Sequence, residues 1–110
     1  MNISATRTEG EVRICLNGEL DHHSARFAIP EISRVIDTEL PLSLILDFSG
    51  ISFMDSSGIA IVIGSYKKAT ALGADFMVEN VPKQAHKVFS AAGICKLINI
   101  SSVDSSPAKI

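Results

Sequence analysis

The sequence predicts a single α/β domain: a mixed central sheet of about four strands, plus one candidate edge strand, with helices packed on it. Three observations lead to this fold class. Strand-like and helix-like segments follow one another in the order β-β-α-β-α-β-α, the middle of the chain holds an apolar run of strand length, and 110 residues suit one domain. Strands that alternate with helices are typical of a parallel or mixed sheet.

The first two strands are predicted to pair across a turn. Residues 11–18, EVRICLNG, alternate apolar and polar side chains, which is the period of a strand with one buried face. Residues 2–7 carry the same signal more weakly, and the intervening Glu9-Gly10 suits a turn. The chain therefore opens with two neighbouring strands.

The remaining strands lie in the middle and at the end of the chain. Residues 42–48, LSLILDF, form a continuous apolar run, which is typical of a central strand covered on both faces. This strand is predicted to end at Phe48. Residues 75–80, DFMVEN, predict a further strand, and the short segment 97–100, LINI, predicts the edge strand.

Two helices are predicted in the second half of the chain. The segment after Gly58 places apolar side chains at helical spacing, and Gly73 suits its left-handed terminator. Its inward positions are predicted to be Ile59, Val62, Ile63, Tyr66 and Ala69. Residues 82–92 predict a helix with Pro82 in its first turn and Gly93 as its stop. Its inward positions are predicted to be Ala85, Val88, Phe89 and Ala92.

A third helical pattern, residues 24–38, is interrupted by Pro30. Proline lacks the amide proton that an interior helical position donates, and its ring collides with the preceding turn. We therefore expect either a kink at Pro30 or a helix that starts near it.

Composition and charge restrict the class of protein. The chain is 46% hydrophobic and 20% charged, which is typical of a globular domain. The net charge is −2 and Lys and Arg form no dense cluster, which argues against nucleic acid and anionic membranes as partners. No apolar run has the length of a membrane span or the pattern of a signal peptide, so we expect a cytoplasmic protein. Cys15 and Cys95 lie in apolar runs and are expected to be buried, reduced thiols.

The motif FMDSSG, residues 53–58, places two serines where a helix is predicted to begin, near Ser57. One interpretation is structural, because a serine oxygen at that position caps the free amides of the first turn. The other is functional: an exposed hydroxyl there can accept a phosphoryl group, which a helix N-terminus tolerates and an acidic or apolar partner surface does not. The residues alone leave Ser56 and Ser57 open, although Ser56, at the predicted cap, is the more reachable.

Several enzymatic interpretations fail on spacing. A hydrolase nucleophile elbow needs glycine two residues before the serine, where Met54 or Asp55 stands. Ser65 and Lys68 fit a Ser-x-x-Lys pattern inside a predicted helix, without a second motif, and a phosphate-cradling Gly-x-x-x-x-Gly-Lys loop is absent.

Asp47, near the end of the central strand, lacks the acidic pair that a phospho-accepting aspartate needs. We expect it to cap a loop or to pair at the carboxyl edge of the sheet.

A second polar segment, GELDHHSA at residues 18–25, offers a carboxylate and two imidazoles. Asp21, His22 and His23 could serve as metal ligands, but adjacent side chains diverge and the chain has one further histidine, His86. The alternative is a surface turn that leads into a helix capped by Asp21.

Three segments together resemble the STAS domain family, and within it the sporulation anti-sigma F factor antagonists. They are GELDHHSA at 18–25, LILDFSGISFMDSSGIAIVIGSYKKA at 44–69 and VPKQAHKVFSAAGICKLINI at 81–100. The resemblance covers residues 1–100 as one STAS domain. Residues 101–110 are small and polar and are expected to form a disordered tail.

The resemblance implies a protein-binding switch that is not itself an enzyme. The unphosphorylated form of such proteins binds an anti-sigma factor that is also a serine kinase with bound nucleotide, and the sigma factor is released. The kinase then phosphorylates the serine after the aspartate, here Ser56, which ends binding until a phosphoprotein phosphatase removes the phosphate. Asp55, Ser57 and Gly58 flank that site, and Asp21 corresponds to a partner contact beside it. The resemblance implies no cofactor, metal, nucleic acid or membrane.

Two alternatives stay open at this point. The chain could be a STAS module of another pathway, one of general stress or of nucleotide or anion sensing. It could also be a metal-dependent phosphoesterase built on Asp21, His22 and His23. The interrupted pattern at Pro30 departs from the uninterrupted first helix of the family.

Overall fold

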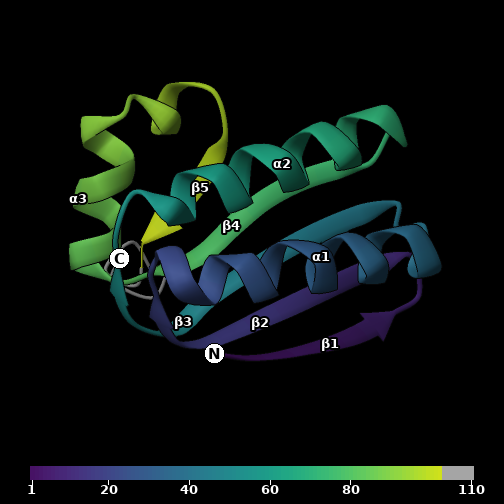
Figure 1. Cartoon of the computed structure of the whole chain (residues 1–110). Coiled ribbons are helices and arrows are strands. Elements are labelled where there is room, and N and C mark those ends of the chain that lie inside the picture. Colours follow the sequence, from purple (N-terminus) through teal and green to yellow (C-terminus); the bar gives the residue numbers. More distant parts are fainter. Residues whose placement is uncertain (103–110) are drawn as a thin grey trace.

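The structure, a computed structural model that describes residues 1–102, consists of a central sheet with helices lying across it (Figure 1). Its elements are β1 (Asn2–Thr8), β2 (Glu11–Leu20), α1 (His22–Glu39), β3 (Ser43–Met54), α2 (Ser57–Ala71), β4 (Asp75–Val81), α3 (Lys83–Ala91), a 3-10 turn η1 (Ile94–Lys96) and β5 (Asn99–Ser102). The strands lie in the order β1-β2-β3-β4-β5. β1 is antiparallel to β2 and the other neighbours are parallel, so the predicted element order and mixed sheet are confirmed.

The core lies between the sheet and the helices. α1 and α2 run side by side across one face of the sheet (Figure 1). Alternate positions of the strands point into this layer; on β2 and β3 they include Val12, Ile14, Leu44, Leu46 and Phe48. α3 contributes Phe89, whose ring centroid lies 5.8 Å from that of Phe48. Burial of these apolar side chains fixes the three helices relative to the strands.

The central strand is longer than predicted. β3 continues to Met54 instead of ending at Phe48, and β2 continues to Leu20. The two extensions pair after register shifts in β2, and Gly50 approaches Asn17 so closely that a Cβ on it would lie 1.7 Å from the Asn17 Oδ1. The polar second half of β3 stays in the sheet because β2, which is distant in the sequence, supplies its hydrogen bonds. Local periodicity cannot predict such pairing.

The central position of β3 is confirmed, but its two faces are covered differently. α1 and α2 lie on one face (Figure 1). On the other face Ile45 is only 5% exposed, and it lies in register between Arg13 of β2 and Met77 of β4. The apolar run therefore reflects a helix layer on one side and the side chains of neighbouring strands on the other.

Helix α1 is continuous through Pro30, and the expectation that it starts near this residue is wrong. It begins at His22, where Asp21 caps it. Pro30 and Arg26 both lie on the exposed side of the helix. The Arg26 carbonyl would have accepted the amide proton that proline lacks, so the missing bond falls on the exposed side of α1.

The buried stripes of α2 and α3 differ in part from the predicted ones. The buried residues of α2 are Gly58, Ile61, Val62, Ser65 and Ala69. The predicted Ile59, Ile63 and Tyr66 are only partly buried, because α2 contacts α1 as well as the sheet and its buried face is turned toward both. In α3, Ala85 and Phe89 are buried as predicted, whereas Ala92 is exposed.

Two predictions near the chain's end need correction. Cys95 is exposed rather than buried, because in η1 the residue that enters the core is Ile94. Cys15, on β2, is half-buried, and its burial raises the pKa of its thiol. β5 extends to Ser102, so residues 101–102 of the predicted tail belong to the sheet. Residues 103–110, the rest of that predicted tail, lie outside the described residues.

Candidate functional site

The two polar segments singled out in the sequence meet at the carboxyl edge of the sheet. Leu20, the last residue of β2, pairs with Met54, the last residue of β3. The Asp55 amide donates to the Leu20 carbonyl at 3.1 Å, which holds the two strand ends together. The loops that carry Asp21 and Ser56 are therefore neighbours, as expected of parallel strands that end at one edge.

Asp55 caps helix α2. Its Oδ1 accepts a hydrogen bond from the Ser57 amide at 2.8 Å, and its carbonyl accepts one from the Gly58 amide at 3.1 Å. Ser56 occupies the N-cap position but makes no side-chain cap bond, and it is exposed. The interpretation that a serine oxygen caps the helix is therefore wrong. The Asp55 carboxylate takes the Ser57 amide, and backbone carbonyls take the Gly58 and Ile59 amides, so none of these bonds uses the Ser56 hydroxyl.

The start of α2 is packed tightly against the end of β3. Gly58 is buried, and a Cβ on it would lie 2.3 Å from the Met54 Sδ and 2.6 Å from its Cγ. A larger residue here would require the buried Met54 side chain or the first turn of α2 to shift, so glycine allows the close packing that places Ser56 beside the end of β3.

Gln84 of α3 anchors the same strand end. Its Oε1 accepts from the Met54 amide and its Nε2 donates to the Met54 carbonyl, both at 2.8 Å. The side-chain amide thus satisfies both backbone groups of one residue, as a neighbouring strand would. Sequence reasoning missed this contact, because nothing in the local pattern around Gln84 points to a residue thirty positions away.

Asp21 is engaged with the helix that follows it. Its carboxylate accepts from the Ser24 amide at 2.9 Å, and the Ser24 hydroxyl accepts from the Asp21 amide at 3.1 Å, a capping box that confirms the predicted cap. These bonds, above all that from the Ser24 amide, hold the pKa of Asp21 below its ordinary value. His22 and His23 are exposed. Within residues 1–102, no three side chains of His, Cys, Asp or Glu are grouped so that they could hold a metal ion.

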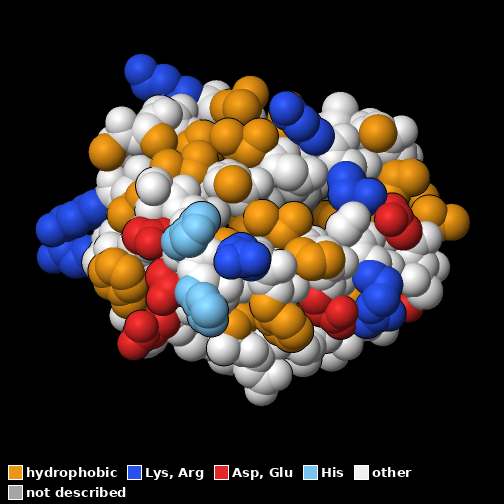
Figure 2. Space-filling model, viewed as in Figure 1, with side chains coloured by type: hydrophobic (Ala, Val, Ile, Leu, Met, Phe, Trp, Pro, Cys, Tyr) orange, Lys and Arg blue, Asp and Glu red, His pale blue; other side chains and the backbone are white. Residues whose placement is uncertain are grey.

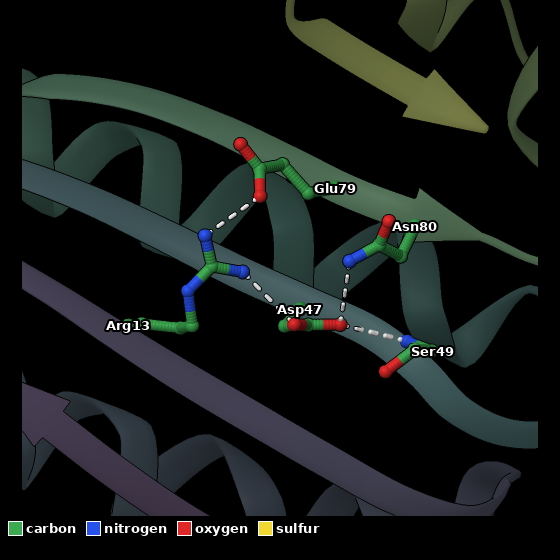
Figure 3. Close-up of polar contacts among 5 residues, drawn as sticks. All are labelled: Arg13, Asp47, Ser49, Glu79 and Asn80. Atoms are coloured by element: carbon green, nitrogen blue, oxygen red, sulfur yellow. Dashed lines mark hydrogen bonds and ion pairs between the residues drawn. The ribbon is translucent and has the colours of Figure 1, made fainter. Parts of the chain in front are cut away.

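Asp47 lies elsewhere, on the sheet face opposite α1 and α2 (Figure 3). Its Oδ2 accepts from Arg13 at 2.9 Å, and Arg13 also donates to Glu79 at 2.8 Å. Its Oδ1 accepts from the Ser49 amide at 2.9 Å and from Asn80 at 3.3 Å. Burial alone would raise the pKa of Asp47, but these hydrogen bonds outweigh it and lower the pKa. Asp47 therefore pairs within the sheet instead of capping a loop at its edge.

An open groove lies beside Ser56, between the first turn of α2 and helix α3. We call it the α2–α3 groove; it has a volume of about 520 Å³ and is lined by Ser56, Ile59, Gln84, Lys87, Val88 and Ala91, among others. Its walls are mainly apolar and Lys87 is its cation. Of the predicted site residues, Ser56 therefore borders a surface depression to which α3 contributes one wall.

The surface over α1 and α2 also exposes apolar side chains (Figure 2). Hydrophobic atoms gather over these two helices and are bordered by Lys and Arg side chains (Figure 2). Phe27 and Ile29 of α1 are 57% and 45% exposed. This face adds apolar contact area near the loop that carries Asp21. Within residues 1–102, no helix has the length and apolar character needed to cross a bilayer.

A family model of the STAS domain matches residues 2–106. The anti-sigma F factor antagonist of Lysinibacillus sphaericus is 34% identical over 87 residues, which are 79% of this chain and 74% of that protein. The anti-sigma F factor antagonist of Paenibacillus polymyxa is 27% identical over 100 residues, which are 91% of this chain and 86% of that protein.

Two solved structures of SpoIIAA have the same fold. The unphosphorylated form, an anti-sigma factor antagonist, matches with a TM-score of 0.76 and 29% identity, and the match covers 92% of this chain and 89% of that chain. The phosphorylated form, a Bacillus cell fate determinant, matches with a TM-score of 0.68 and 29% identity over 92% of both chains. The fold is therefore one for which a phosphorylated and an unphosphorylated form are both known.

Proposed function

This chain belongs to the STAS domain family, and from that premise we propose that it is an anti-sigma factor antagonist of the kind that acts in sporulation. Its unphosphorylated form binds an anti-sigma factor in the cytoplasm, and the sigma factor is released. The anti-sigma factor, a serine kinase with bound nucleotide, phosphorylates Ser56 and thereby ends binding. A phosphoprotein phosphatase restores the active form.

The observation that carries this proposal is the position of the Ser56 hydroxyl. It is exposed at the start of α2 and takes no part in capping the helix, because Asp55 holds the Ser57 amide. A kinase can therefore modify it without breaking a bond that the fold needs. The names of the curated relatives and the two forms of SpoIIAA support the same assignment.

A phosphoryl group at Ser56 would change the interface far more than the fold. Phosphoserine carries a charge of roughly −1.5 to −2 at neutral pH, and at an exposed helix N-terminus this charge stays hydrated. Against a docked acidic or apolar surface the same charge must be desolvated or lie beside like charges. Driving a complex from almost fully bound to almost fully free needs about 5.5 kcal/mol of differential binding, a cost that such a buried dianion can supply.

The chain itself serves as substrate in this cycle. The kinase would supply the base and the magnesium nucleotide that phosphoryl transfer needs, so the domain needs no cofactor or catalytic group of its own. Asp55, Ser57 and Gly58 hold the start of α2 in place, and Asp21, on the adjoining loop, would contact the partner.

Phosphosite mapping with matched variants tests the proposal. The purified chain is incubated with the cognate anti-sigma factor and ATP, and the product is analysed by peptide mass spectrometry. We expect one phosphate per chain at residue 56, no labelling of Ser56→Ala, and full labelling of Ser57→Ala. Labelling at Ser57, or none in the parent chain, would contradict the assignment.

A binding experiment separates this pathway from other STAS pathways. The chain is passed over immobilised anti-sigma factors from the sporulation and general-stress systems, first with ADP and then with ATP. We expect retention by the sporulation factor with ADP and release with ATP as phosphorylation proceeds. Retention by the general-stress factor alone would place the same switch in that other pathway.

A further inference from the structure

The α2–α3 groove brings one lysine to the proposed phosphorylation site. Ser56 lines one wall of the groove and Lys87 lines the other. Among the ion pairs of residues 1–102, Lys87 has no anionic partner, in contrast with Lys68, whose Nζ lies 2.8 Å from the Asp37 Oδ1. A cation without a partner thus borders the same depression as the hydroxyl that would acquire a dianion.

The bonds of Gln84 hold this lysine close to the loop that carries Ser56. Gln84 is fixed to the Met54 backbone by two hydrogen bonds of 2.8 Å. Lys87 lies three residues further along α3, on the same side of that helix, and Ser56 lies two residues beyond Met54. The position of α3 relative to Ser56 is therefore set by a fixed contact, and the flexible stem of Lys87 lies along the mainly apolar groove that Ser56 also lines.

The charges around Ser56 are distributed unevenly. Asp55 precedes it, and Asp21 lies on the adjoining loop, which the Asp55–Leu20 bond holds in place. Both carboxylates repel a phosphoryl group on Ser56. On the opposite side α3 presents Lys87, and the dianion is therefore driven away from the acidic loops and into the groove.

We propose that the phosphoryl group of phosphorylated Ser56 is bound in cis by the ammonium group of Lys87 across the α2–α3 groove. This inference rests on the proposed phosphorylation of Ser56. The ion pair covers the apolar walls formed by Ile59 and Val88 that the unphosphorylated form leaves open. Phosphorylation then acts on partner binding in two ways, by adding charge and by closing the groove.

The experiment uses the whole chain with phosphoserine incorporated at position 56 during translation, so that no kinase is needed. The second pKa of the phosphate, about 6 for a free phosphoserine, is measured by ³¹P NMR titration. An ammonium beside the phosphate favours its dianion, so Lys87→Gln is expected to raise the phosphate pKa by about half a unit or more at low salt, with a smaller effect at high salt.

Two matched variants make the result specific. Lys67→Gln removes an exposed lysine eleven residues along α2 from Ser56, about 16 Å away, and is expected to shift the phosphate pKa much less than Lys87→Gln does. Lys83→Gln removes the other lysine at the start of α3. An unchanged pKa in Lys87→Gln, or a change in Lys83→Gln alone, would overturn the assignment to Lys87.

The experiment distinguishes failure of the ion pair from failure of the proposed function. If Lys87→Gln leaves the phosphate pKa unchanged while the phosphorylated chain still fails to bind the anti-sigma factor, the cis ion pair is refuted and the switch remains. If the pKa responds to Lys87 but no kinase labels residue 56, the ion pair is supported and the proposed function is refuted. Thermal unfolding of each variant checks that the fold is retained.

Discussion

Two polar regions of this domain contain similar residues but differ in what those residues bond to. On one sheet face, Arg13, Asp47 and Glu79 satisfy one another, with both oxygens of Asp47 engaged (Figure 3). At the carboxyl edge, Asp21 and Asp55 bond to backbone amides. The Ser56 hydroxyl beside them remains exposed. In the first region the charged side chains bond to one another. In the second the carboxylates accept hydrogen bonds from backbone amides, and a hydroxyl that can act as a nucleophile stays at the surface.

This difference teaches where stability and recognition reside in the fold. Partly buried charges stabilise a structure only when their partners are in place, so changes in the sheet cluster should affect unfolding. Ser56 contributes no such bond, so changes there should affect binding and leave unfolding alone. Variants in the two regions should therefore separate these two properties.

The largest effect is expected for Ser56→Asp. One added charge at the partner interface should weaken binding of the anti-sigma factor by about 100-fold, short of the 10⁴-fold that a complete switch needs, because aspartate has less charge than phosphoserine. Ser56→Ala should keep the affinity of the unphosphorylated parent even in the presence of ATP, because it cannot be phosphorylated at residue 56. Titration calorimetry measures both, with Ser4→Asp on the exposed edge strand as a control for added charge. Parent-like affinity of Ser56→Asp would contradict the proposed interface.

The second largest effect is expected for Asp47→Asn, which disrupts the cluster of Arg13, Asp47 and Glu79 on the sheet face. The amide keeps the shape of the side chain but loses its charge, and Arg13 keeps only Glu79. We expect the free energy of unfolding to fall by about 1–3 kcal/mol with no change in partner affinity. Urea denaturation measures the first and calorimetry the second. A loss of affinity at unchanged stability would mean that the two regions are not separate.

The same variant has a pH signature. The pKa of Asp47 is lowered in the folded chain, so its contribution is fully present above its ordinary pKa, about 4, and is lost as the pH falls through its folded pKa. The difference in unfolding free energy between parent and Asp47→Asn should thus be constant near neutrality and shrink below about pH 4. A difference in unfolding free energy that stays constant down to pH 2 would contradict the assignment of this stability to the ionised Asp47 carboxylate.

A smaller effect is expected for Gln84→Ala, which removes the anchor of the strand end. Two hydrogen bonds to Met54 are lost, but both backbone groups can be rehydrated near the surface, so the loss of stability should be about 1–2 kcal/mol. Hydrogen exchange should show faster exchange of the Met54 amide. Gln84→Glu keeps the acceptor for that amide and should exchange more slowly than Gln84→Ala.

The smallest effect is expected for Asp55→Ala, which removes the cap of α2. Loss of the Asp55 carboxylate, which accepts from the first amide of α2, costs about 1 kcal/mol. The Ser56 hydroxyl, at the N-cap position, can then bond to an amide of the first turn instead. We therefore expect slower phosphorylation of Ser56 as well as the small loss of stability. Rapid-quench labelling with the kinase measures the rate, and Asp55→Asn, which retains a capping oxygen, should recover most of it.

Much of the fold could be predicted because its signals are local. The alternation in residues 11–18 and the helical spacing after Gly58 come from the period of each element, which short-range geometry fixes. Of the two expectations at Pro30, the start of a helix near it is wrong for the same reason, whereas the expected kink stays a prediction. The local penalty of Pro30 is real, but the packing of the rest of α1 on the sheet outweighs it and the helix continues.

The sequence by itself determined the fold class, the capping of α1 by Asp21 and the place of the FMDSSG motif at the start of a helix. Only the tertiary structure decided that Asp55 rather than a serine caps α2, that Gln84 binds Met54 and that Lys87 shares a groove with Ser56. The physical reason is the range of the forces involved. Periodicity and caps act within one or two turns, whereas these contacts depend on the register of strands and the packing of helices that are far apart in the chain.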